Sequence, residues 1–398
     1  MALTPVQVSA ETGAPAGPVA GSVPDYLGRR VPELDGLRGL AIALVLMVHY
    51  GANQLHPKPG TILNYVREGF SFGWCGVDLF FVLSGFLIGG ILIENRASPN
   101  FFKTFYVRRV CRIFPLYYAW LLVTLLLLAL RLPDHVHNLV QPALPFWSYF
   151  TYTQNVLSLK LGDFGPEWFG PTWSLAIEEQ FYLLFPLLVR FCSPRRLPGW
   201  LVVLVFSATM FRVLAYFFTP HPGFASYLLL PCRWDSLLLG ALTAWLVRRP
   251  GFVEGVKQNE SFLFWVGGVI LATLFGLRLA RQGGLLSLSN ALLGFLLLAI
   301  LFCGLLLLAL FSRKKWIKAI FTNRWLCKLG CVSYCVYLIH QPVAFLCHNL
   351  IWHQSPIISG VPKLMTTVLA LGTTLGLALL SWRFFESKCV NWGRKFAY

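Results

Sequence analysis

His49 is a titratable residue inside a long apolar stretch near the start of the sequence. It lies in LDGLRGLAIALVLMVHYG (residues 34–51), whose mouth carries Asp35 and Arg38. At roughly 1.5 Å per helical residue, His49 lies about 16 Å further along the helix than Arg38. A histidine in hydrocarbon is costly, and such residues mark functional sites by default. An imidazole can act as a general base or a nucleophile and an arginine can bind phosphate, so this stretch predicts a reaction centre beside a phosphate site.

Three other titratable residues are expected at a similar depth in the membrane. Glu178 and Glu179 lie in PTWSLAIEEQFYLLFP, and His340 lies in SYCVYLIHQP, close to Pro342, where we expect the helix to kink. Because neighbouring helical residues point about 100° apart, we expect one of the two glutamates to face the site. We predict that a carboxylate, His49 and His340 meet there. The alternative is that each is a structural residue with a partner of its own.

Arginines cluster at the cytoplasmic end of the expected site. The segment FYVRRVCRIFPLYY carries Arg108, Arg109 and Arg112 just before an expected span. Arg108 and Arg112 share a helix face at i, i+4. Together with Arg38 they predict a cradle for phosphates, because arginine forks match phosphate oxygens. The alternative is positive charge that only fixes the orientation in the membrane.

Small residues accompany these charged groups on the first two apolar segments. Gly36 and Gly39 in LDGLRG are positions where a ligand could approach the backbone. Ser84 in LFFVLSGFLIGG precedes Gly85, and this pair is expected to support close helix packing. We therefore expect Ser84 to be structural and not a nucleophile.

The composition indicates a chain built for a bilayer. Of its 398 residues, 57% are hydrophobic and 12% are charged, against about 25% charged in soluble domains. The 33 Lys and Arg outnumber the 16 Asp and Glu, but they gather in connections between apolar segments, which argues against nucleic acid as a partner. The ten cysteines are scattered without a CxxC pair, so we predict no metal site.

Ten segments are long and apolar enough to span a bilayer, which predicts an all-α polytopic membrane bundle. The expected spans are 37–57, 74–94, 113–131, 172–191, 198–218, 225–247, 261–279, 285–311, 330–351 and 363–385. The loop 132–171 is rich in aromatic residues and proline. We expect it to cover a pocket mouth on the outer side, although an aromatic belt at the interface accounts for it equally well.

The distribution of Lys and Arg predicts the orientation of the bundle. These residues are concentrated after the even-numbered spans and at both chain ends, so both termini are expected in the cytoplasm. Residues 1–30 are rich in Ala, Pro and Gly and are expected to form a flexible cytoplasmic tail. Residues 31–390 are then expected to form the transmembrane domain, located in the cell inner (plasma) membrane.

Five segments together resemble the membrane-bound acyltransferase-3 family of polysaccharide O-acyltransferases. In chain order they are LDGLRGLAIALVLMVH, GVDLFFVLSGFLI, FYVRRVCRIFPLYY, PTWSLAIEEQFYLLFP and SYCVYLIHQP. Each motif alone is moderately specific, whereas all of them in order over roughly residues 33–390 are strong. Some members of the family carry an added soluble esterase-like domain. This chain has no length for one, so we expect a partner or the membrane domain alone to complete the transfer.

The resemblance implies an O-acyltransferase that moves a short acyl group, acetyl by default, from cytoplasmic acyl-CoA to a hydroxyl of a glycan, glycolipid or other acceptor. It implies no permanently bound cofactor, with membrane lipids as the surroundings. The catalytic candidates are His49, Glu178, Glu179 and His340. The acyl-CoA-binding candidates are Arg38, Arg108, Arg109 and Arg112. The substrate-binding candidates are Asp35, Asp78, Trp173, Ser174 and Tyr337.

Two alternatives remain at this point. Within the enzyme hypothesis, His49 acts either as a general base on the acceptor hydroxyl or as a covalent acyl carrier. A protein of another class, a transporter or flippase of a glycan or lipid precursor, could use His49 and the glutamates as a proton relay. That hypothesis explains buried titratable residues but neither the motif order nor the arginine cluster. A third hypothesis is the other large histidine-dependent group of membrane acyltransferases. It is disfavoured because its motifs are not the ones found in this sequence.

Overall fold

The structure is a computed structural model that describes residues 31–130, 132–279 and 290–398. Every regular element in these ranges is helical, which confirms the predicted all-α class. The predicted tail 1–30 and the beginning of the expected span 285–311 lie outside the described residues.

The described part of the chain contains seven helical segments that are long and apolar enough to cross a membrane. The number is eight if the bent pair Arg324–Cys331 and Ser333–Trp352 is counted as one span. The seven are Pro32–Ala52, Ile62–Glu94, Phe101–Ala129, Leu197–Phe218, Glu260–Leu277, Leu292–Phe311 and Val361–Arg394. Helices also occupy the expected spans 172–191 and 225–247, but they are not among these seven segments. In the first of them α8 (Thr172–Phe191) carries Glu178 and Glu179, and in the second α11 (Leu230–Leu246) has only 17 residues. The protein is therefore an integral membrane protein with multiple spanning helices.

The first half of the chain forms α1 to α8 with two irregular helical turns, η1 and η2. Their bounds are α1 Pro32–Leu46, η1 Met47–Ala52, α2 Ile62–Ser71, η2 Phe72–Cys75, α3 Gly76–Glu94, α4 Phe101–Ala129, α5 Asp134–Val140, α6 Phe146–Phe150, α7 Gln154–Leu161 and α8 Thr172–Phe191. Because α4 begins at Phe101, its arginines lie within the helix and not before it.

The second half forms α9 to α19. Their bounds are α9 Leu197–Phe218, α10 Pro222–Leu228, α11 Leu230–Leu246, α12 Phe252–Gln258, α13 Glu260–Leu279, η3 Asn290–Gly294, α14 Phe295–Phe311, α15 Lys315–Phe321, α16 Arg324–Cys331, α17 Ser333–Trp352, α18 Val361–Ser381, η4 Trp382–Glu386 and α19 Ser387–Arg394. The chain bends by 75° between α16 and α17, whereas the helix α17 runs through Pro342 without ending.

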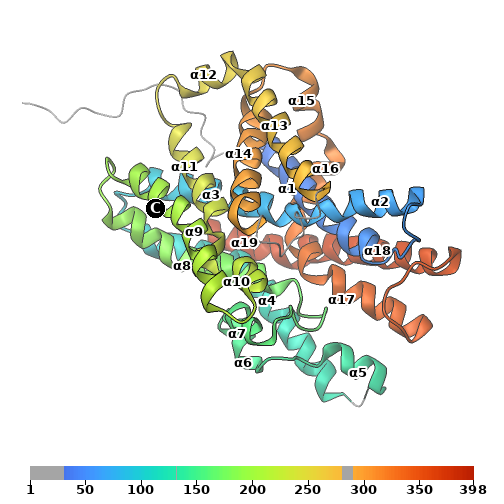
Figure 1. The fold of residues 1–398 in the computed structure, drawn as a ribbon. Coiled ribbons are helices and arrows are strands. Elements are labelled where there is room, and N and C mark those ends of the chain that lie inside the picture. Colours follow the sequence, from blue (N-terminus) through green and yellow to red (C-terminus); the bar gives the residue numbers. More distant parts are fainter. Residues whose placement is uncertain (1–30, 131, 280–289) are drawn as a thin grey trace, which may run out of the picture.

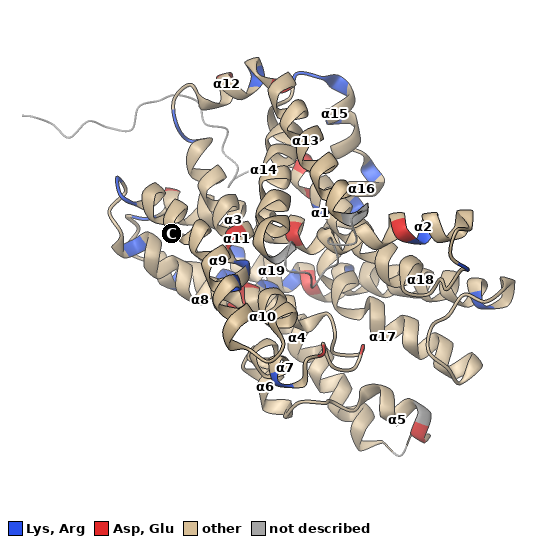
Figure 2. Ribbon diagram, viewed as in Figure 1, with Lys and Arg blue, Asp and Glu red and all other residues tan. Residues whose placement is uncertain are grey.

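Two groups of short connecting helices lie at opposite ends of the molecule. Figure 1 shows α5, α6 and α7, which belong to the loop 132–171, far from α12 and α15. Figure 2 shows Lys and Arg on α12, α15 and α16, and also on the connections near α8 and the C-terminus. This is the distribution expected if that end faces the cytoplasm and the loop 132–171 faces outward.

Glycines let several helices pack backbone to backbone. A side chain at Gly36 would overlap the Phe321 carbonyl of α15, and one at Gly39 would overlap the Leu326 carbonyl of α16. These two glycines therefore pack α1 against its neighbours and are not positions for ligand approach, as the sequence had suggested. Gly85 of α3 likewise contacts the backbone of α11, which confirms close packing beside Ser84.

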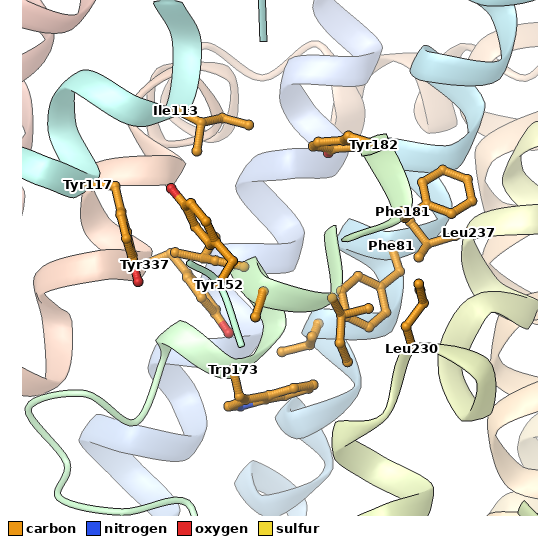
Figure 3. Packing of buried hydrophobic residues seen from close by; sticks show 14 of the residues in the cluster. Phe81, Ile113, Tyr117, Tyr152, Trp173, Phe181, Tyr182, Leu230, Leu237 and Tyr337 are labelled. Carbon is orange, nitrogen blue, oxygen red and sulfur yellow. The ribbon is translucent and has the colours of Figure 1, made fainter. Parts of the chain in front are cut away.

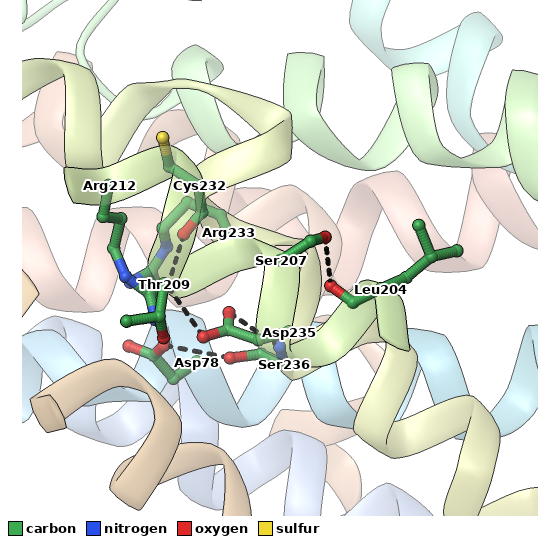
Figure 4. Close-up of polar contacts among 9 residues, drawn as sticks. All are labelled: Asp78, Leu204, Ser207, Thr209, Arg212, Cys232, Arg233, Asp235 and Ser236. Carbon is green, nitrogen blue, oxygen red and sulfur yellow. Dashed lines mark hydrogen bonds and ion pairs between the residues drawn. The ribbon is translucent and has the colours of Figure 1, made fainter. Parts of the chain in front are cut away.

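Two ion pairs lie fully buried where α3, α9 and α11 meet (Figure 4). Arg233 of α11 contacts Asp78 of α3 at 2.7 Å, and Arg212 of α9 contacts Asp235 of α11 at 2.7 Å, all four side chains being 0% exposed. The Arg233 guanidinium also stacks 3.9 Å from the centre of the Phe295 ring. Asp78, expected to bind substrate, is instead one partner of a structural ion pair.

Candidate active site

One cavity gathers most of the predicted charged residues, and we name it the arginine cavity. It encloses about 100 Å³. Its polar lining consists of Arg38, Ser84, Arg109, Arg112, Ser174, Glu178, Glu179, Tyr182, Ser333, Tyr334 and Tyr337. The guanidinium groups of Arg38, Arg109 and Arg112 lie close enough to interact electrostatically with one another and with Glu178. Three guanidinium groups in one cavity provide hydrogen-bond donors suited to a phosphorylated ligand.

Side-chain hydrogen bonds fix the orientation of Glu178 in this cavity. The Ser84 hydroxyl donates to Glu178 Oε1 at 2.6 Å, and the Tyr182 hydroxyl donates to Ser84 Oγ at 3.1 Å. Glu179 Oε1 and Arg109 Nε are buried and find no hydrogen-bond partner among the described residues. The arrangement holds one glutamate rigidly and leaves polar atoms of its neighbours for a bound ligand.

A second cavity contains both predicted histidines, and we name it the histidine cavity. It encloses about 540 Å³, within the usual range of ligand sites. Its walls come from η1, the loop before α8, α17 and residues 355–357. The lining includes His49, Asn53, Trp74, Asp163, Phe164, Glu167, Trp173, Tyr227, His340, Gln341 and Phe345. Aromatic faces beside carboxylates and amides suit a ligand with both apolar and hydroxyl surface.

The two histidines face each other across the helices that carry them. The His49 and His340 rings lie 4.9 Å apart between centroids at an angle of 62°. The Gln341 side-chain amide nitrogen lies 2.8 Å from His49 Nδ1, which fixes the His49 ring. The Tyr337 carbonyl lies 2.7 Å from His340 Nδ1, so Nδ1 is the donor and Nε2 carries the lone pair. His340 Nε2 is buried without a partner in the described part of the chain.

His49 lies in a π-helical turn that no sequence pattern revealed. The turn η1 spans Met47–Ala52 and directly continues α1. Single turns of this kind are frequent at functional sites, because the wider turn redirects side chains from the regular helical register. The turn therefore decides which face His49 presents, and it directs the imidazole toward α17.

The two cavities meet at Val77 and Tyr337, the residues that line both. The Tyr337 hydroxyl is hydrogen-bonded to Ser174 Oγ at 2.6 Å. Tyr337 and Trp173 belong to one buried aromatic cluster, together with Tyr182 and Phe81 (Figure 3). Val77 and Tyr337 therefore form the boundary between the two cavities.

The predicted residues divide between these two cavities in a way the sequence did not suggest. The glutamates line the arginine cavity and the histidines line the histidine cavity, so no carboxylate of α8 meets His49. The predicted meeting of His49 with His340 is present in the structure. Of the substrate-binding candidates, Ser174 and Tyr337 line the arginine cavity, while Trp173 and Tyr337 line the histidine cavity.

Three predicted residues lie outside both linings, namely Asp78 of the buried ion pair, Arg108 and Asp35. Arg108 donates from Nε and Nη2 to the Phe396 carbonyl at 2.9 and 2.7 Å and stacks over Tyr398. It therefore contacts the C-terminal segment and does not line the cavity. Asp35 pairs with Arg38 at 3.6 Å and lines neither cavity itself. Ser84, Tyr182 and Gln341 are among the cavity residues that were not predicted as part of the site. The i, i+4 spacing of Glu178 and Tyr182 on α8 is the one sequence signal that could have found a partner of the glutamate.

The side chains that line the two cavities are suited to acid–base chemistry and to binding anions. Among the described residues, no group of three or more His, Cys, Asp and Glu side chains could hold a metal ion. The arginines could bind a phosphorylated donor such as coenzyme A, and the imidazoles could take a proton from a hydroxyl.

Comparison with known proteins assigns this arrangement to a family. The sequence profile of the acyltransferase-3 family, described as an acyltransferase domain, matches residues 31–383. The chain belongs to the acyltransferase-3 family. Its acyltransferase domain thus covers nearly all of the described helices, including every element that lines the two cavities. This assignment favours an enzyme over a transporter.

Several O-acetyltransferases are similar to this acyltransferase-3 protein. O-acetyltransferase OatA of Staphylococcus aureus is 26% identical over 376 residues, which cover 91% of this chain and 57% of the relative. Peptidoglycan O-acetyltransferase OatA of Listeria monocytogenes is 28% identical over 386 residues, covering 91% and 56%. A putative O-acetyltransferase of Staphylococcus aureus, SACOL0978, is 26% identical and is covered to 59%. The chain thus spans a little over half the length of these relatives. No solved structure matches the chain.

Proposed function

We propose that this acyltransferase transfers an acetyl group from acetyl-CoA, bound in the arginine cavity, to a hydroxyl of a cell-envelope glycan or glycolipid in the histidine cavity. The observation that carries the proposal is the contact of an arginine-lined cavity with a histidine-lined cavity at Val77 and Tyr337. The similarity to O-acetyltransferases, one of them named for peptidoglycan, supports the acetyl donor and the glycan acceptor. The proposed location is the cell inner (plasma) membrane.

The proposed reaction moves the acetyl group from the thioester of the donor to the acceptor hydroxyl. The acceptor hydroxyl oxygen attacks the thioester carbonyl carbon, a C–O bond forms and the C–S bond breaks. His49 accepts the hydroxyl proton, and that proton leaves with the coenzyme A thiolate as the free thiol. The adjacent His340 imidazole can share the proton, and the Gln341 amide holds the His49 ring in place. Formation of an acyl-imidazole on His49 is the covalent variant of the same transfer.

The arginine cavity has a binding role in this proposal. Arg38, Arg109 and Arg112 bind the phosphates of coenzyme A, because each guanidinium forms charge-assisted hydrogen bonds with phosphate oxygens. Glu178 and Glu179 hold these cations in place, since both line the same cavity. In the histidine cavity, Trp173 and the other aromatic side chains bind the apolar faces of sugar rings.

The proposed function is tested with radiolabelled acetyl-CoA and soluble peptidoglycan fragments as acceptor. We expect purified protein in lipid nanodiscs to form an acetyl ester on the fragments that mild base releases. A pH-gradient-driven flux of a precursor without any ester formation or thioester cleavage would instead support a transporter. Mass spectrometry of envelope glycans from wild-type and deletion cells then identifies the natural acceptor by its mass shift.

The first prediction compares two arginines of α4. Arg112→Ala removes a cavity-lining guanidinium, and loss of one charged hydrogen bond raises the KM for acetyl-CoA roughly 10- to 150-fold. Arg108→Ala is the matched comparison, because Arg108 contacts Phe396 outside the cavity lining. We expect a far smaller change in KM for Arg108→Ala. Steady-state kinetics at saturating acceptor measure both, and equal effects of the two variants would argue against a phosphate site in this cavity.

A further inference from the structure

The junction of the two cavities is narrow and rigid. Val77 and Tyr337 line both cavities, and each is only 7% exposed. Tyr337 is held by the hydrogen bond to Ser174 at 2.6 Å and by an edge contact with Phe80 at 6.0 Å between ring centroids. Its carbonyl is engaged by His340. Tyr337 is therefore held at its hydroxyl, its ring and its backbone carbonyl.

Val77 is held as firmly on the opposite side. A valine side chain has one strongly preferred rotamer in a helix, so it cannot turn aside easily. The preceding Gly76 packs against the Ala41 carbonyl of α1, and the following Asp78 is ion-paired with Arg233 of α11. The start of α3 is thus fixed against two helices, and the position of Val77 with it.

We propose that Val77 and Tyr337 form the constriction that holds the acyl group of the donor where the two cavities meet, and that this constriction selects short acyl chains. The inference rests on the proposed function. If the coenzyme A phosphates stay on the arginines and the thioester carbonyl stops at the junction, where a hydroxyl in the histidine cavity can attack it, the acyl end of the donor packs against Val77 and Tyr337. A closely packed wall there rejects added methylene groups, because well-packed side chains cannot make room without strain.

The test measures a preference among donors. Purified full-length protein in nanodiscs receives equal concentrations of acetyl-, propionyl- and butyryl-CoA with peptidoglycan fragments as acceptor. The products give the ratio of kcat/KM for butyryl to that for acetyl. Each methylene in a fitted pocket changes such a ratio about 10- to 200-fold, so Val77→Ala is expected to raise it at least about tenfold. Tyr337→Phe, which frees the ring from Ser174, is expected to raise it in the same direction.

Val77→Ile provides the opposite change and is expected to lower the propionyl-to-acetyl ratio. Val203→Ala is the matched control, because Val203 is 57% exposed on α9 and lines neither cavity. A ratio within one preparation does not depend on the fraction of folded protein, so a general loss of stability cannot imitate the result. Unchanged ratios in Val77→Ala or in Val77→Ile would overturn the constriction. Absence of transfer in the wild-type protein would instead overturn the proposed function.

Discussion

His49→Ala is expected to reduce acyl transfer to the acceptor by about 10²- to 10⁴-fold, the usual contribution of a positioned general base. The physical reason is that His49 lines the histidine cavity between Gln341 and His340, where a hydroxyl proton must be removed. If His49 carries the acyl group covalently, the loss is at least as large. Initial rates of acetyl-ester formation in nanodiscs measure the effect.

The controls for His49→Ala separate chemistry from folding. His137→Ala changes a histidine of α5 that lines neither cavity, and we expect wild-type rates from it. Membrane insertion and the elution profile in detergent are expected to match the wild-type protein in both variants. A correctly inserted His49→Ala protein that transfers acetyl at the wild-type rate would remove His49 from the mechanism.

Arg233→Ala is expected to destabilise the fold by about 3–5 kcal/mol, because it leaves the Asp78 carboxylate buried without its partner. The two side chains are 0% exposed and 2.7 Å apart, and Arg233 also contacts the Phe295 ring. Thermal unfolding in detergent, followed by tryptophan fluorescence, measures the loss. Arg195→Ala, at an exposed arginine between α8 and α9, is the control and is expected to unfold like the wild-type protein.

A double variant shows whether the charge or the packing matters in this cluster. Asp78→Leu combined with Arg233→Leu removes both charges, and replacing a whole buried pair by apolar residues is often neutral. We therefore expect the double variant to recover most of the stability lost in Arg233→Ala. Equal unfolding temperatures for the wild-type protein and Arg233→Ala would show that this ion pair has no structural role.

Helix geometry explains which parts of the site were predictable. Apolar length predicted the helical bundle, and spacing along the helix placed His49 and His340 at one depth. Spacing cannot decide which helices are neighbours, and here α17, not α8, presents its side chains to His49. For the same reason Glu178, at a similar expected depth, lies in the other cavity.

The arginines of α4 show a second limit of sequence patterns. Arg108 and Arg112 share a helix face at i, i+4, but Arg109 and Arg112 also do so at i, i+3. The C-terminal segment packs against α4 and engages Arg108, which leaves the other pair in the cavity. Asp78 and Arg233 are 155 residues apart in the chain, so their pairing depends on tertiary packing that no local pattern contains.

The most direct test of the two-cavity account supplies donor and acceptor on opposite sides of a membrane. Proteoliposomes are loaded with soluble peptidoglycan fragments, and radiolabelled acetyl-CoA is added only outside. The account predicts ester-linked label on the enclosed fragments from sealed vesicles, and its loss in His49→Ala vesicles. Label that reaches the fragments only after the vesicles are permeabilised would contradict acetyl transfer from one side of the membrane to the other.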